Sequence, residues 1–280
     1  MPADTGFPRA DVENDFLRAR RRQVLSRLAQ WLSREPDDVN VILPLDEVVA
    51  ALGWQGERRL GLRTIPLDTI VGTVDSSRDF DRRFRPTSAR VRERWERLAL
   101  ARRRGDPIPP IDVYRIDGLH FVRDGHHRVS IAFATGMSTI DACVTRIDTA
   151  VPAGHIRGRG DLLMKGCERI FRARVPLPSQ AYTQITCTDP RSYAELGEAV
   201  EAWGFRCMQD KGHFLDREQT ARHWLAQEFT PVVQLLRAAD LVGAGTEAEA
   251  YLRVARQRDR LLRTHEWNDE VIERLRRAVR

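Results

Sequence analysis

The stretch IDVYRIDGLHFVRDGHHRVSIAFATG, from Ile111 to Gly136, decides the fold of this 280-residue chain. Its first six residues alternate between apolar and polar side chains, which is typical of a half-buried strand. Asp117-Gly118 is a strong hairpin signal, so Leu119 to Val122 is expected to be the returning strand. A second Asp-Gly turn leads into a helix, and Gly136 is expected to end that helix. The stretch therefore predicts a strand hairpin that feeds directly into a helix.

The segments on both sides of this stretch predict an α/β (α+β) fold. We expect a small mixed-sheet core at residues 60–148, an N-terminal helical extension at 1–59 and a mainly helical C-terminal region at 149–280. Pro66 suits an edge strand, because proline cannot donate a hydrogen bond to a neighbouring strand. Helices are predicted at 11–34, 46–52, 88–103, 126–135, 190–203, 216–236, 247–262 and 268–279, and strands at 62–67, 111–116, 119–122, 140–147 and 184–188.

The composition is that of a soluble globular protein, with 42% hydrophobic and 31% charged residues. The sequence contains no apolar run long enough to cross a bilayer. The N-terminus is polar and no secretory apolar segment follows it, so we expect a cytoplasmic protein with no membrane partner. The formal net charge of +6 suggests an anionic partner such as nucleic acid. An arginine bias that reflects a G+C-rich genome would give the same charge.

The predicted helix at 11–34 has apolar residues at three- and four-residue steps and many arginines between them. Such a helix can lie on a membrane surface or on nucleic acid. We favour the simpler interpretation, in which it packs against its own domain.

The Asp124-Gly125-His126-His127-Arg128 loop joins a strand end to a helix start. The first N–H groups of a helix have no internal partner, and together with the helix dipole they favour an anion. We expect Gly125 to let a ligand approach the backbone and Arg128 to fork onto phosphate oxygens. Asp124 either caps the helix or holds Mg²⁺ beside a phosphate. His126 and His127 add donors, and one of them could move a proton. A capped helix with two exposed histidines fits the same residues.

Three acidic residues precede the predicted helix at 88–103. Asp75 follows an apolar stretch and has no adjacent arginine, so it is our candidate catalytic base or metal ligand. Asp79 and Asp81 lie among arginines, and we expect them to order the loop through ion pairs. No compact cluster of carboxylates suggests a two-metal nuclease.

The order of elements and two motifs resemble the ParB/sulfiredoxin-like domain superfamily. Arg78-Asp79-Phe80-Asp81 is similar to the Pro-Arg-x-x-Phe-Asp segment of ParB proteins, and Gly125-His126-His127-Arg128 is similar to their Gly-Glu-Arg-Arg loop. Sulfiredoxins have a cysteine where this chain has His126, so sulfinic acid repair is excluded. The Asp-Gly-His-His-Arg form also resembles free-serine kinases. The whole chain is similar to actinobacterial ParB-like proteins with helical extensions.

This resemblance implies that a nucleoside triphosphate or diphosphate binds at the loop. The expected function is that of a nucleotide-dependent phosphotransferase or NTPase, with Asp75 and His127 as catalytic candidates and Mg²⁺ at Asp124. The alternative is a ParB-like DNA-binding regulator without catalysis. Partition proteins follow this domain with a helix-turn-helix, and no such module can be placed after Ile147 in this sequence.

Overall fold

A computed structural model describes residues 5–33, 42–74, 79–154, 156, 158–212, 214–262, 271 and 273. The chain divides into two compact units, Met1–Lys165 and Gly166–Arg280, so the division lies inside helix α5 (Gly160–Arg174). The sequence suggested boundaries after residues 59 and 148 instead. The N-terminal helices belong to unit 1 because they cover its sheet. In the described part of the chain, we find no helix with the length and apolar character needed to span a bilayer.

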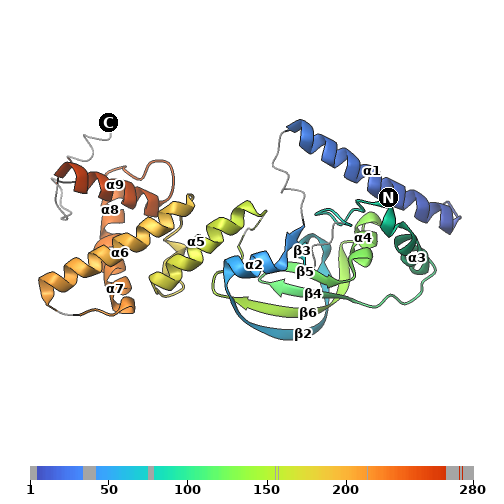
Figure 1. The fold of residues 1–280 in the computed structure, drawn as a ribbon, viewed down its shortest axis with the longest axis horizontal. Coiled ribbons are helices and arrows are strands. Elements are labelled where there is room, and N and C mark those ends of the chain that lie inside the picture. Colours follow the sequence, from blue (N-terminus) through green and yellow to red (C-terminus); the bar gives the residue numbers. More distant parts are fainter. Residues whose placement is uncertain are drawn as a thin grey trace. The chain divides into compact units, whose positions relative to one another are not determined.

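Unit 1 is built on one mixed six-stranded sheet, which confirms the predicted fold class. The strand order is β1-β3-β5-β4-β6-β2 (Figure 1). The β4–β5 and β6–β2 pairs are antiparallel, and the other neighbours are parallel. The edge position of β2 was predicted, but β2 is longer than expected because it pairs along nearly all of β6. The strands are β1 (Leu43–Pro44), β2 (Trp54–Pro66), β3 (Ile70–Thr73), β4 (Ile111–Ile116), β5 (Leu119–Asp124) and β6 (Thr139–Thr149).

Helices cover both faces of this sheet. Helix α2 (Leu45–Leu52) buries its apolar side on one face, against residues such as Ile116 and Phe121. Helices α1 (Pro8–Ser33), α3 (Arg92–Arg103) and α4 (His126–Ala134) share a core with the other face, where Ile111 and Val113 are buried. Burial of apolar surface on both faces is what holds a mixed sheet of this kind together.

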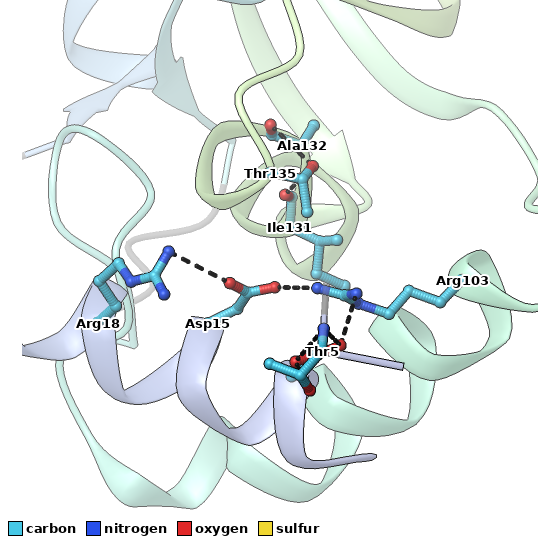
Figure 2. Close-up of polar contacts among 8 residues, drawn as sticks. Thr5, Asp15, Arg18, Arg103, Ile131, Ala132 and Thr135 are labelled. Carbon is cyan, nitrogen blue, oxygen red and sulfur yellow. Dashed lines mark hydrogen bonds and ion pairs between the residues drawn. The ribbon is translucent and has the colours of Figure 1, made fainter. Parts of the chain in front are cut away.

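Helix α1 packs against its own domain, as we favoured from the sequence. Figure 2 shows how the buried Asp15 of α1 meets α3: Arg103 donates a 2.7 Å hydrogen bond from Nη2 to Asp15 Oδ2. Arg103 also lies 3.5 Å from Oδ2 of the buried Asp11. The side chain and backbone N–H of Thr5 also donate to Asp11. Phe16 packs edge-on against the buried Trp95, with 5.5 Å between ring centroids. The N-terminal helix is therefore part of the unit 1 core.

Unit 2 is helical. Its described helices are α6 (Pro190–Lys211), α7 (Arg217–Trp224), α8 (Thr230–Ala238), α9 (Glu247–Leu262) and the C-terminal half of α5. Helix α5 was not predicted. The strand predicted at 184–188 was wrong, because this segment follows a 3-10 turn (Ala181–Thr183) and pairs with no strand. The helix predicted at 268–279 lies outside the described residues except for Val271 and Glu273.

The single amphipathic helix predicted at 216–236 contains an irregularity. Helices α7 and α8 join through a π-helical turn, Leu225–Phe229, without a break. This turn carries Glu228, which is buried and lies 3.6 Å from the guanidinium of the buried Arg258. The Tyr251 hydroxyl lies 3.5 Å from the same carboxylate. The π turn therefore brings a polar group into the core of unit 2, where it finds partners.

Candidate functional site

The turn between β5 and α4 depends on Gly125. This residue is the N-cap of α4 and adopts a left-handed conformation with φ of 108°. A Cβ atom here would lie 2.5 Å from Cγ2 of Ile111, a fully buried residue of β4. The sequence led us to expect that Gly125 leaves room for a ligand. The space beside it is instead filled by Ile111, so the glycine serves close packing of the turn on the sheet.

Arg128 stabilises the same turn from the first turn of α4. Its Nη1 lies 2.7 Å from the carbonyl oxygens of Pro109 and Pro110, and its Nη2 lies 2.5 Å from Asp124 Oδ2. The Asp124 side chain is 67% exposed, whereas that of Arg128 is 13% exposed. Arg128, the residue predicted to bind phosphate, thus already has a carboxylate partner. The exposed Asp124 side chain has room to rotate toward solvent.

His126 points inward. Its Nε2 lies 2.5 Å from the hydroxyl of Thr73, a buried residue of β3. The Thr73 hydroxyl also donates to the carbonyl of Val122 at 3.1 Å. Since a hydroxyl has one proton to donate, this arrangement places a proton on His126 Nε2. The imidazole therefore ties α4 to β3.

His127 is half-buried and neutral at physiological pH. Burial and the positive charge of Arg94 lower its pKa, Asp79 opposes the shift, and together they bring the pKa to about 4. Its ring meets Phe80 edge-on, with 5.3 Å between ring centroids. The Nδ1 atom is buried and has no hydrogen-bond partner. A buried polar atom without a partner is costly, so this nitrogen is suited to a ligand that hydrogen-bonds to it, and with the proton of the neutral ring on Nδ1 it can donate to an oxygen such as that of a phosphate.

The loop before α3 is ordered by Asp81, as predicted. Its Oδ1 accepts hydrogen bonds from the backbone N–H of Arg83 and Arg85, and its Oδ2 accepts from Arg85 Nε at 2.7 Å. Phe84, in a left-handed conformation, is fully buried in the same loop. Asp79 lies close enough to influence His127. Asp75, the predicted catalytic base, lies outside the described residues.

A cavity of about 230 Å³ borders this site. It is lined on one side by Pro109, Pro110 and Arg128 and on the other by apolar residues of α4 and β6 such as Ile131 and Ile140. An apolar cavity beside a guanidinium offers space for the uncharged part of a phosphate ester. The other lining residues are Arg102, Asp106, Ile108, Met137 and Asp141.

The described residues do not contain a group of three or more His, Cys, Asp or Glu side chains that could hold a metal ion. Mg²⁺ is commonly bound by one or two carboxylates together with substrate phosphates and water. The metal site at Asp124 therefore stays a prediction.

The structure brings together some predicted residues and adds others. Asp124, His126, His127 and Arg128 lie around the start of α4 as expected. The partners that fix them were missed, because Thr73 and the Pro109 carbonyl lie far from the loop in sequence and no local pattern points to them. Phe80 was within a quoted motif, and its contact with both histidines could have been suspected from that resemblance alone.

The fold and site define an α/β protein whose sheet places a histidine-rich turn at the end of a central strand. A scan against models of known protein families finds no match for this chain, and a search among curated proteins finds none either.

Proposed function

We propose that unit 1 binds the phosphate groups of a nucleotide at the start of α4, and that the protein is a nucleotide-dependent phosphotransferase or NTPase. The observation that supports this most is the unpartnered Nδ1 of His127 beside an N-cap glycine that offers no side-chain cap. Helix N–H groups, Arg94 and Arg128 make the surroundings electropositive. The resemblance of the loop to those of ParB-like proteins agrees with this proposal.

The Asp124–Arg128 pair suggests how such a ligand is accepted. A phosphate that approaches Arg128 competes with the exposed Asp124 carboxylate for the same guanidinium. Asp124 would then turn outward, where it can bind Mg²⁺ that accompanies the phosphates. Arg128 keeps its hydrogen bonds to Pro109 and Pro110 during this exchange, so the turn stays in place. A bound nucleoside triphosphate would supply the phosphoryl group.

The experiment is a thermal-shift screen with nucleoside di- and triphosphates, with and without Mg²⁺. A ligand at 100 times its Kd stabilises the folded state by about 2.7 kcal/mol, which raises the Tm of a unit of this size by roughly 5–10 °C. Asp124→Asn should retain the shift without Mg²⁺ and lose the additional shift that Mg²⁺ gives. Arg128→Lys should lose most of the shift, because lysine cannot bind a phosphate and two carbonyls in a fork.

Arg123→Gln is the matched control, since Arg123 pairs with Asp112 on the neighbouring strand and takes no part in the turn. Each variant is compared with its own ligand-free Tm, so a loss of stability is not mistaken for a loss of binding. The proposal fails if no nucleotide at millimolar concentration shifts the wild-type Tm, or if Arg128→Lys responds as the wild type does. Release of phosphate from a nucleotide that binds then tests turnover.

A further inference from the structure

Three arginines lie in line across three adjacent strands of the sheet. Arg58 of β2 is directly opposite Arg146 of β6, and Arg146 is level with Arg115 of β4. Residues paired in this way direct their side chains to the same face, and neighbouring strands are about 4.8 Å apart. All three side chains are exposed. We call these three residues the arginine row; the strands that carry it lie side by side in Figure 1.

The arginine row continues the face that α1, α3 and α4 cover. Two residues earlier on β4 and β6 stand Val113 and Val144, which are buried in the core beneath these helices. The row begins where that core ends, so its arginines are not needed to close the core.

The position of the row has an electrostatic cost. Like charges directly opposite each other on a sheet destabilise it. Arg146 pairs with Asp148 at 2.6 Å, and Arg115 donates from Nε to the carbonyl of Asp117. Arg58 makes no ion pair with any residue that the structure describes. Of the three guanidinium groups, Arg146 is thus the one that an ion pair in the described part of the chain neutralises.

The residue of β5 that is level with the arginine row does not compensate the positive charge of the row. His120 is level with Arg115, and it is buried. Burial and the positive charge of Arg115 together lower its pKa to about 4. Farther along β2, the exposed Arg63 lies opposite Ala142 on the same face. This face is therefore a positively charged surface on the rigid part of the molecule.

We propose that the arginine row binds the phosphate backbone of double-stranded DNA without sequence preference. Arginine forks match phosphate oxygens, and a row of fixed positive charges fits a polymer with regularly spaced negative charges better than it fits a single small anion. Proteins that prefer single strands usually add aromatic side chains on which bases stack. No Phe, Tyr or Trp is paired with these three arginines, and the residue level with them on β5 is the buried His120. The row therefore suits contact with the backbone of a duplex better than stacking on single-stranded bases.

This surface is separate from the proposed nucleotide site. His120 and Asp124 stand at opposite ends of β5, four residues and thus about 13 Å apart. DNA binding through the row and nucleotide binding at α4 can therefore be tested independently of each other.

The test is fluorescence anisotropy of a labelled 20-base-pair duplex of arbitrary sequence, titrated with the full chain at several salt concentrations between about 50 and 200 mM. Three backbone contacts predict that log K falls with log[salt] with a slope of about −3, and each contact removed reduces the slope by about 1. The triple variant Arg58→Gln, Arg115→Gln, Arg146→Gln should bind at least tenfold more weakly at the lowest salt. It should keep the nucleotide-induced shift of the wild type.

The matched control carries Arg222→Gln, Arg237→Gln and Arg256→Gln, three exposed positions of unit 2, and removes the same net charge. It should retain wild-type affinity and slope. The proposal is overturned if the wild type does not bind duplex at the lowest salt, if both triple variants lose affinity equally, or if polyglutamate or single-stranded DNA of equal length competes as well as the duplex. Thermal denaturation checks that both triple variants are folded.

Discussion

Replacing Gly125 with alanine should destabilise unit 1 far more than the same change at other turns. The left-handed conformation costs a residue with a Cβ about 1–2 kcal/mol. The new Cβ would also lie 2.5 Å from Cγ2 and 2.9 Å from Cβ of Ile111. Ile111 is fully buried on a central strand and cannot move aside, so this contact adds about 1–3 kcal/mol. The expected total is about 3 kcal/mol, or a fall of roughly 10 °C in Tm.

Two other glycines separate these contributions. Gly136 also has a positive φ, of 72°, but a Cβ atom at this position would meet nothing within 4 Å, so Gly136→Ala should show the conformational cost alone. Gly118 has neither a positive φ nor a neighbour within 4 Å, so Gly118→Ala should change stability by less than about 1 kcal/mol. Urea denaturation followed by circular dichroism measures all three.

The contact with Ile111 can be tested directly by a double-mutant cycle. Ile111→Ala removes the atom that the new Cβ would meet, so the double variant with Gly125→Ala should be less destabilised than the sum of the two single variants. If Gly125→Ala costs no more than Gly136→Ala, or if the two changes are additive, the close packing of this turn on β4 is not what requires a glycine.

Three further outcomes follow from the buried polar groups of unit 1. Arg103→Ala should cost about 3 kcal/mol by denaturation, because the buried Asp11 loses its cation and the buried Asp15 keeps only the 3.7 Å pair with Arg18; a loss below about 1 kcal/mol would contradict the docking of α1. The pKa of His120 is about 4 in the folded state and 6.5 when the side chain is exposed. Between these pH values the unfolded state binds a proton that the folded state does not bind. The free energy of unfolding should therefore fall as the pH drops from about 6.5 toward 4, by up to about 3 kcal/mol. His120→Gln should flatten this part of the pH profile. Asp81→Asn should destabilise the fold by about 1–2 kcal/mol through the loss of charge-assisted hydrogen bonds. The rise in Tm that a nucleotide induces should be unchanged if Asp81 only orders its loop.

The features predicted correctly are those set by local chemistry. The β4–β5 hairpin follows from the alternation of Ile111 to Ile116 and from Asp117-Gly118, and α4 begins and ends close to the predicted positions. Gly136 marks the end of that helix because it supplies a positive φ. The edge position of β2 follows from Pro66.

The features that were missed depend on contacts between distant segments. The first half of β2 has both faces exposed, so its residues show no alternation, and only the pairing with β6 reveals a strand. Helix α5 contains Gly160 and Gly166 and follows Gly158, and these glycines hid its pattern. At the site, the sequence indicated that Arg128 matters but could not show that Asp124 and two proline carbonyls already bind it. Long-range partners of this kind have no signature in a single sequence.

The π turn at Leu225–Phe229 fixes the length of the helical stretch that contains it. A regular α-helix turns by about 100° per residue, and a π turn is one residue longer than the turn it replaces. Deletion of one residue within this turn would let the backbone relax into an ordinary helix and leave α7 and α8 facing as they do now, so Trp224 and Leu236, both fully buried, could still face the same core. Deletion of one residue within α7 or α8 removes no such surplus residue and would rotate everything beyond it by about 100°. Natural variants of this chain should accordingly tolerate the loss of one residue inside Leu225–Phe229 better than the loss of one residue in the helices on either side.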